Sequence, residues 1–187
     1  MDFSPVRQFL RRETASLHKD LDRLVGEFSS RSAYQAFLAG SAGFRLPLEA
    51  VIAAHDLPDA FGQWRPALVG SDIMADLGDL EMTPRPVSQT EPAPERTENW
   101  LGMIYVLEGS SLGAQLLARR AAELGLSQTF GARHIFAQAR NISNWRAFSG
   151  IMDGMQILDW QALSDSAIRT FRFAYRAYES SLECRLA

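Results

Sequence analysis

Two glycines inside an apolar run are the first residues that suggest chemistry. Gly109 and Gly113 are four residues apart in the segment 105–120, whose apolar spacing predicts a helix. A glycine inside a helix costs about 1 kcal/mol relative to alanine, and residues four apart share a face. We therefore expect something to lie against bare backbone there. It is either a tightly packed neighbouring helix or a flat ligand over a helix that bends at glycine.

A histidine near the N-terminus is the second chemical feature. His18 lies on a stripe of apolar residues at helical spacing, which indicates an inward side chain; the stripe comprises Leu10, Leu17, Leu21, Leu24 and Val25. An inward histidine is either a hydrogen-bonded core residue or a metal ligand, since neutral imidazole is the commonest ligand for metals. Arg11 lies two turns earlier on the same face, about 10.5 Å along the axis, where a guanidinium would hold an anionic group of a ligand centred on the imidazole.

Taken together, the two segments resemble the bacterial heme oxygenases, including members associated with phytochromes. The most specific part of the resemblance is the run Leu-Glu-Gly-Ser-Ser-Leu-Gly at 107–113, with the early Leu-His pair at 17–18. The order of helices, the proline-rich break before the glycine helix and the segment 145–148 extend it over most of the chain. The resemblance implies an all-α, single-domain bundle in which heme lies between a proximal helix and a distal helix bent at its glycines.

The resemblance also implies roles for individual residues. His18 would be the axial ligand of the heme iron, and Gly109 with Gly113 would let the distal backbone approach the porphyrin. Arg11 and Arg146 match the positions of basic contacts to the heme propionates. For Arg11, an exposed arginine in a basic pair remains the alternative.

Ser110 is a departure from the family pattern. Well-studied members, mammalian ones among them, carry an aspartate directly after the first distal glycine, where it anchors a water network beside bound oxygen. A serine hydroxyl forms hydrogen bonds but has no charge and no useful pKa. We expect the Gly109 backbone and Ser110, with ordered water, to orient the oxygen. Glu108 lies about 100° round the helix and is not assigned this role.

The implied activity is oxidative cleavage of heme, as both substrate and cofactor, to biliverdin with release of CO and ferrous iron. The reaction uses O2, and no flavin or nicotinamide motif occurs in the sequence, so a separate electron-donor protein or a small reductant must supply electrons. A biliverdin-accepting phytochrome is a further candidate partner. Two alternatives remain: a heme carrier or sensor without turnover, motivated by Ser110, and a helical interaction module in which His18 is core and both glycines serve helix packing.

Composition and residue spacing argue against several other classes of function. With 19 basic and 22 acidic residues the net charge is -3, so no basic excess is present for nucleic acid. His55 and His134 have no partner at metal-ligand spacing, which argues against zinc and di-iron sites. We see no apolar segment of membrane-spanning length, no signal peptide, and a single cysteine, Cys184. We therefore expect a cytoplasmic protein with no membrane or nucleic-acid partner.

Length and apolar content predict one domain over 1–187, since 187 residues that are 47% hydrophobic suffice for one core. Apolar spacing is helical almost throughout, with Ser71 placed to cap the third helix. The stripe Phe171, Tyr175 and Tyr178 is either core or the cover of a heme edge. Residues 81–94 read as an extended connector, and helices are expected at 4–26, 31–54, 70–80, 97–124, 129–139, 142–154 and 159–185.

Overall fold

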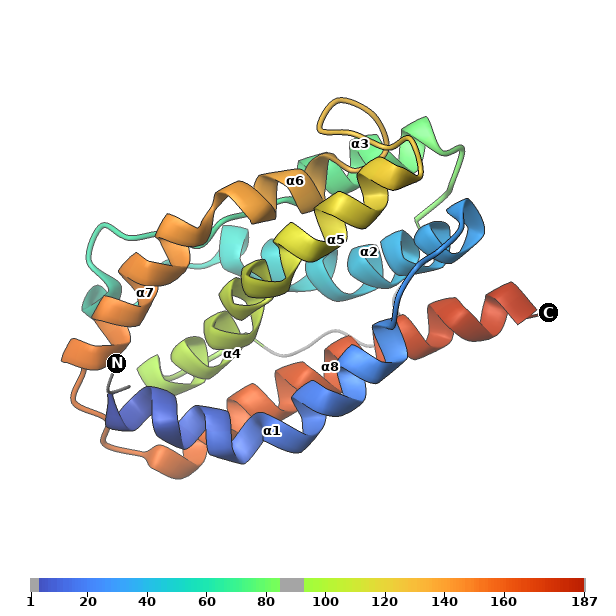
Figure 1. Ribbon diagram of the computed structural model, residues 1–187. Helices are drawn as coiled ribbons and strands as arrows, with labels where there is room; N and C mark the ends of the chain where they lie inside the picture. Colours follow the sequence, from blue (N-terminus) through green and yellow to red (C-terminus); the bar gives the residue numbers. More distant parts are fainter. Residues whose placement is uncertain (1–3, 85–92, 187) are drawn as a thin grey trace.

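The structure is a computed structural model that describes residues 4–84 and 93–186, with side chains as far as residue 182 (Figure 1). No strand occurs in these ranges, where isolated bridges around Ser127 are the only β-type pairing. The expected all-α architecture is confirmed. The elements are α1 (Pro5–Val25), α2 (Arg31–Ala54), the 3-10 turn η1 (Asp59–Phe61), α3 (Gly70–Asp79), α4 (Thr97–Gly109), α5 (Ser111–Glu123), α6 (Arg133–Arg140), α7 (Ile142–Gly154) and α8 (Trp160–Leu186).

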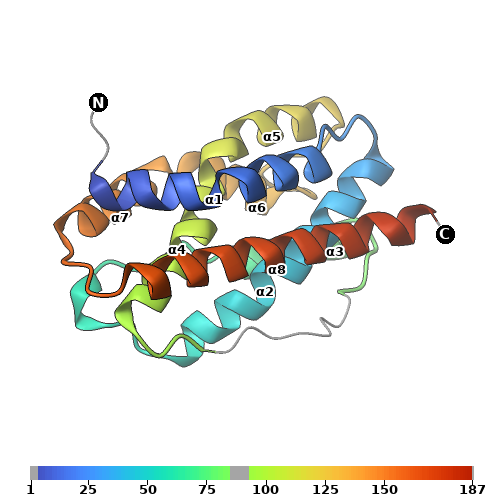
Figure 2. The same ribbon diagram turned by 90° about the horizontal axis from the view of Figure 1, so that it is seen from below.

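The long helix α8 is the centre of the arrangement, because α1, α2 and α4 all pack against it. Figures 1 and 2 show α1 and α8 side by side and running in the same direction. Helix α5 packs mainly on α6, and α3 lies between α2 and α6. Two apolar clusters fill the interior, one shared by α1, α2, α4, α7 and α8 and the other by α2, α3, α5 and α6.

The helix predicted over 97–124 is in reality two helices, and this is the main correction to the expected elements. Helix α4 ends at Gly109 and α5 begins at Ser111, and Figure 2 shows the change of direction between the two helices. Helix α6 starts later than the expected residue 129, because the preceding residues form a turn with Gly131 at a φ of 71°. Within the connector predicted at 81–94, residues 85–92 lie outside the described part.

The start of α3 is held by a distant side chain rather than by Ser71, so that predicted cap is wrong. The Glu49 carboxylate on α2 accepts hydrogen bonds from the backbone N–H groups of Val69 (2.9 Å) and Gly70 (2.7 Å). A carboxylate also complements the positive end of the helix dipole. Glu49 therefore fastens α3 to α2.

Two helices are long and apolar enough to cross a membrane by length and composition, contrary to the expectation that no such segment exists. They are Arg31–Ala54 and the combined span Thr97–Glu123. Buried residues make up 61% and 56% of their most apolar windows, so the protein itself covers more than half of each. Their apolar character is explained by core packing.

A buried hydrogen bond between an aspartate and a histidine joins α3 to α6, and it uses a histidine for which the sequence showed no partner. Asp76 Oδ2 lies 2.8 Å from His134 Nδ1, and both side chains are fully buried. Asp76 also accepts from the backbone N–H groups of Arg133 and His134, which start α6. Burial lowers the pKa of His134, with Asp76 only partly opposing the effect. Burial acts to raise the pKa of Asp76, but the hydrogen bonds from His134 and Arg133 outweigh it and the pKa falls.

Where α4 crosses α8, Gly102 is the residue that allows close approach. A β-carbon at this position would lie 2.5 Å from the carbonyl oxygen of Leu163 and 2.8 Å from the β-carbon of Ser166. Both atoms belong to α8, and one is backbone, which cannot swing aside. The close helix packing that the sequence suggested for Gly109 and Gly113 is therefore found at Gly102, about two to three turns earlier.

We predict that Gly102→Ala lowers the free energy of unfolding by about 1–3 kcal/mol, because α4 and α8 must separate to admit the methyl group. Urea unfolding monitored by circular dichroism measures the change. Gly78→Ala in α3 is the control, since a β-carbon there meets nothing within 4 Å. Equal stability of Gly102→Ala and the wild type would contradict the close crossing.

We also predict a loss of stability on acidification that originates at His134. Because burial lowers its folded pKa, the neutral form contributes its full stabilisation above the ordinary pKa of about 6.5 and loses it as the pH falls below that value. The loss per proton is at most about 1.4 kcal/mol per pH unit. Urea midpoints at pH 7.5 and 5.5 should differ for the wild type and differ less for His134→Gln, whose amide still donates to Asp76. His55→Gln, on the exposed end of α2, should behave as the wild type; an unchanged difference in His134→Gln would exclude this origin.

Candidate functional site

Gly109 and Gly113 do not face a neighbouring helix. A β-carbon on Gly113 would meet nothing within 4 Å, and one on Gly109 would come no closer than 3.8 Å to the ring of Trp145, which is ordinary contact. The close-packing explanation for these two glycines is therefore wrong. Of the two explanations that their spacing allows, a ligand against the backbone remains.

The same face of α5 carries large apolar side chains that the protein leaves uncovered. Leu112 and Leu116 are each 53% exposed, and at 3.6 residues per turn they lie within the same narrow stripe as Gly109 and Gly113. The opposite face of α5 is buried through Ala114, Ala118 and Ala121. An exposed apolar stripe beside open glycine backbone is typical of a ligand-binding surface.

His18 on α1 is exposed, so the expectation of an inward side chain is wrong. The exposed fraction of its side chain is 61%, and the ring lies with its centroid 5.8 Å from that of Phe171 on α8. Apolar periodicity placed His18 on the buried stripe, whereas it lies at the edge of that stripe. A core role for this histidine is thereby excluded, and its ring is accessible to a ligand.

Asp22 orients the His18 ring. Its Oδ2 lies 2.9 Å from His18 Nδ1, one turn further along α1. A carboxylate accepts hydrogen bonds, so in the neutral imidazole the tautomer that suits this contact has the proton on Nδ1 and the lone pair on Nε2. Metal-binding histidines commonly have such a carboxylate partner. Sequence reasoning missed Asp22, although its four-residue spacing from His18 was the available signal.

The exposed stripe of α5 and the exposed His18 ring of α1 both lie just beyond one point where α1 approaches α4. Burial raises the pKa of Tyr105 on α4, while the nearby Thr14 hydroxyl and Arg11 charge, both on α1, partly oppose this effect. One turn beyond this contact, α1 presents His18 and α4 presents Gly109. Past that point α5 turns away from α1 (Figure 1), and its principal packing partner is α6. The uncovered stripe and the exposed imidazole therefore lie where the helices diverge.

The hydrogen bonds of the Ser110 side chain are made to other groups of the protein. Its hydroxyl donates to the Leu107 carbonyl (2.7 Å), lies 3.0 Å from Gln138 Oε1, and accepts from Arg45 (3.1 Å). The Ser111 hydroxyl likewise donates to the Glu108 carbonyl at 2.6 Å. Serine hydroxyls that bond back to carbonyls of the preceding turn bend helices. The Ser-Ser pair thus accounts for the change of direction between α4 and α5.

The remaining predicted residues border this region to different degrees. Arg11 is exposed on α1 and close to Tyr105, and Arg146 is exposed on α7. Phe171 lies beside His18, whereas Tyr178 bonds to Ser41 of α2 and belongs to the core. The roles of Arg11 and Arg146 toward a ligand stay predictions.

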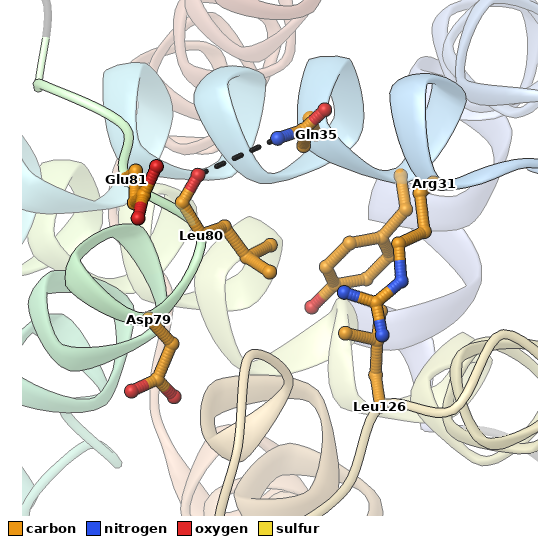
Figure 3. A pocket seen from close by; sticks show the side chains of 7 residues that line it. Arg31, Gln35, Asp79, Leu80, Glu81 and Leu126 are labelled. Atoms are coloured by element: carbon orange, nitrogen blue, oxygen red, sulfur yellow. Dashed lines mark hydrogen bonds between the residues drawn. The ribbon is translucent and has the colours of Figure 1, made fainter.

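A cavity of about 210 Å³ lies elsewhere, between α2, the end of α3 and Leu126 (Figure 3). Arg31, Tyr34 and Asp79 are among the residues that line it, and none of them comes from α1 or α5. Pockets that enclose drug-sized ligands usually occupy about 300–1,000 Å³. This cavity is therefore separate from the exposed stripe and small for a macrocycle.

The comparisons with known proteins agree with these observations. No protein-family model matches the chain. The heme oxygenase PigA of Pseudomonas aeruginosa is 31% identical over 162 residues, which cover 81% of this chain and 82% of that protein. A heme oxygenase of Xanthomonas campestris pv. campestris is 33% identical over 106 residues, 51% of this chain and 62% of that protein. The NO- and CO-bound heme oxygenase of Neisseria meningitidis has the same fold, with a TM-score of 0.78 at 22% identity over 96% of this chain and 92% of that one.

We predict opposite effects of Gly113→Ala on stability and on hemin binding. Because a β-carbon there meets open space, alanine should raise the free energy of unfolding of the ligand-free protein by up to about 1 kcal/mol. The same methyl group should weaken hemin binding, because it stands where a flat ligand would lie. Urea unfolding and hemin titration measure the two effects. Gly78→Ala, also in open space but on α3, is the matched control for binding; unchanged hemin affinity in Gly113→Ala would place the ligand elsewhere.

Proposed function

The chain belongs to the bacterial heme oxygenase family, and on this premise we propose that it holds heme between His18 of α1 and the backbone of Gly109 and Gly113. Its activity is the oxidative cleavage of heme to biliverdin, with release of CO and ferrous iron. The observation that carries the proposal is the pairing of an exposed, oriented imidazole with an uncovered apolar stripe in which glycine leaves the backbone bare. These residues fit a flat, largely apolar ligand with a metal at its centre.

On the α1 side, His18 Nε2 would bind the iron of the substrate. Asp22 would hold the ring in the required orientation and make the imidazole a stronger donor through the hydrogen bond to Nδ1. The edge of Phe171 limits the movement of the ring from the α8 side.

On the α5 side, Leu112 and Leu116 would cover the porphyrin plane, and burying them on binding contributes to affinity. Heme supplies the redox chemistry when it is bound. The protein contributes position, because bare backbone at Gly109 and Gly113 leaves space for oxygen next to the iron. Since the Ser110 hydroxyl has protein partners, the Gly109 backbone and ordered water are the groups that would orient oxygen, with Ser110 in support.

Two arginines would hold the propionates at the edge of the heme. Arg11 lies on α1 two turns before His18, and Arg146 lies on α7 in the segment that brings Trp145 against Gly109. A guanidinium binds a carboxylate in a bidentate manner, which fixes the rotation of the macrocycle as well as its depth. This rotation decides which meso carbon faces the oxygen.

Electrons and O2 would come from outside the chain. The sequence contains no flavin or nicotinamide motif, so the donor is a separate protein or a small reductant. We place the reaction in the cytoplasm, where biliverdin would be available to a phytochrome. The names of the relatives favour turnover over the alternative of a heme carrier or sensor.

A hemin titration followed by reductant and oxygen in the same cuvette tests the proposal. We expect saturable one-to-one binding by the wild type, then loss of the heme band and appearance of biliverdin. His18→Ala should abolish turnover, and Asp22→Asn should weaken binding by about 10–100-fold, the usual cost of losing a carboxylate behind a metal-binding histidine.

His55→Ala is the control for loss of an exposed histidine far from the site and should behave as the wild type. Binding without biliverdin would favour the carrier. Unaltered turnover in His18→Ala would contradict the assignment of the iron ligand.

A further inference from the structure

A buried arginine lies beneath the bend between α4 and α5. Arg45 comes from α2, one of the most apolar helices of the chain, and only 4% of the residue is exposed. Burying a guanidinium costs several kcal/mol unless its donors are satisfied, and a buried ion pair is weak evidence for a stabilising role. Its position therefore requires an explanation other than stability.

All the contacts of Arg45 converge on the bend and its surroundings. Nε donates to Glu49 Oε1 at 2.8 Å, and Nη2 donates to the Ala67 carbonyl at 3.0 Å. Nη1 lies 3.3 Å from the Leu107 carbonyl and 3.1 Å from Ser110 Oγ. One guanidinium thus connects α2, the segment before α3, the last turn of α4 and the residue at the break.

The bend creates the need for these donors. The last carbonyls of a helix have no amide partner within that helix, and here they end in the protein interior. The Leu107 carbonyl accepts hydrogen bonds from Ser110 Oγ and from Arg45. The bond from Arg45 is the stronger kind, because a charged donor gives a stronger hydrogen bond than a neutral one. Arg45 also donates to the Ser110 hydroxyl. It thereby fixes the group that donates to the Leu107 carbonyl in place of a backbone amide.

Arg45 is itself held rigidly. Glu49 accepts from Arg45 Nε and from two backbone N–H groups at the start of α3, so the carboxylate is fixed on both sides. The neighbouring Glu108 accepts from the backbone N–H of Ala67 at 2.6 Å, which ties the residue before Gly109 to the same segment. Movement of the bend would break several charge-assisted hydrogen bonds at once.

We propose that Arg45 is a positioning residue that fixes the angle between α4 and α5, and through it the place of the Gly109 backbone over the heme. The inference rests on the proposed function, because it concerns the same site. Arg45 touches neither the exposed stripe nor His18, so it acts through Leu107 and Ser110. A small shift of Gly109 changes where oxygen is held, and positioning errors of about 1 Å can cost about a hundredfold in rate.

The test is the double variant Arg45→Met/Glu49→Gln. It removes both charges together, and the glutamine carbonyl can still accept from the backbone at the start of α3, so the fold is retained. We expect hemin binding close to that of the wild type, at least about a tenfold lower rate of biliverdin formation, and an altered ratio of the biliverdin isomers. Arg45→Lys keeps the pair with Glu49 but lacks the fork that reaches the bend, and it should alter the isomer ratio in the same direction.

Arg133→Met is the matched control. It removes another arginine with two carboxylate partners, Asp76 and Asp79, at the α3–α6 junction. It should lower the free energy of unfolding without changing the isomer ratio. A wild-type rate and isomer ratio in both Arg45 variants would overturn the inference while leaving the heme oxygenase activity intact. Failure of the wild type itself to produce biliverdin would instead refute the proposed function, and the inference with it.

Discussion

The backbone break at Ser110 is the constraint on which the site depends. A continuous helix over these residues would satisfy its own carbonyls, but the bend leaves those of Leu107 and Glu108 to side-chain donors. Two serine hydroxyls and one buried guanidinium provide them. Because of the bend, α4 packs in the core against α8 while α5 packs on α6, and one stripe of α5 is left uncovered.

The position of His18, on the other side of the proposed site, depends on the packing of α1. Helix α1 packs on α8, and Thr14 and Arg11 of α1 lie near Tyr105 of α4. Because the helices separate after this contact, His18 is exposed one turn later rather than covered by α4. The proposed site is thus a consequence of one contact and one bend. Apolar surface that is exposed in the free protein is the surface that heme would cover.

The sequence predicted the fold class, which depends on local pattern, and from the same kind of pattern it proposed the principal site residues, whose roles stay predictions. Helical spacing of apolar residues identified every helical region, and the cost of glycine within a helix singled out Gly109 and Gly113. Periodicity misplaced His18, because it cannot tell a stripe that meets the core from one that borders a ligand. The resemblance implied a helix bent at its glycines, but the division into two helices at Ser110 was missed, since serine back-bonding leaves the apolar spacing unchanged.

Pairs distant in sequence were beyond such reasoning. Asp76 with His134, and Arg45 with Leu107, lie 58 and 62 residues apart, and only the packing of helices brings them together. The same holds for Glu49, which replaces Ser71 as the group that fastens the start of α3. In each case a buried charge serves the backbone of another helix, a relation that residue types alone do not reveal.

The most direct test of the account is a crystal structure of the hemin complex. We predict iron bound to His18 Nε2 and the opposite face of the porphyrin in van der Waals contact with the backbone of Gly109 and Gly113, with the bend at Ser110 retained. Iron bound to another residue, or hemin seated away from the stripe of Leu112 and Leu116, would contradict it.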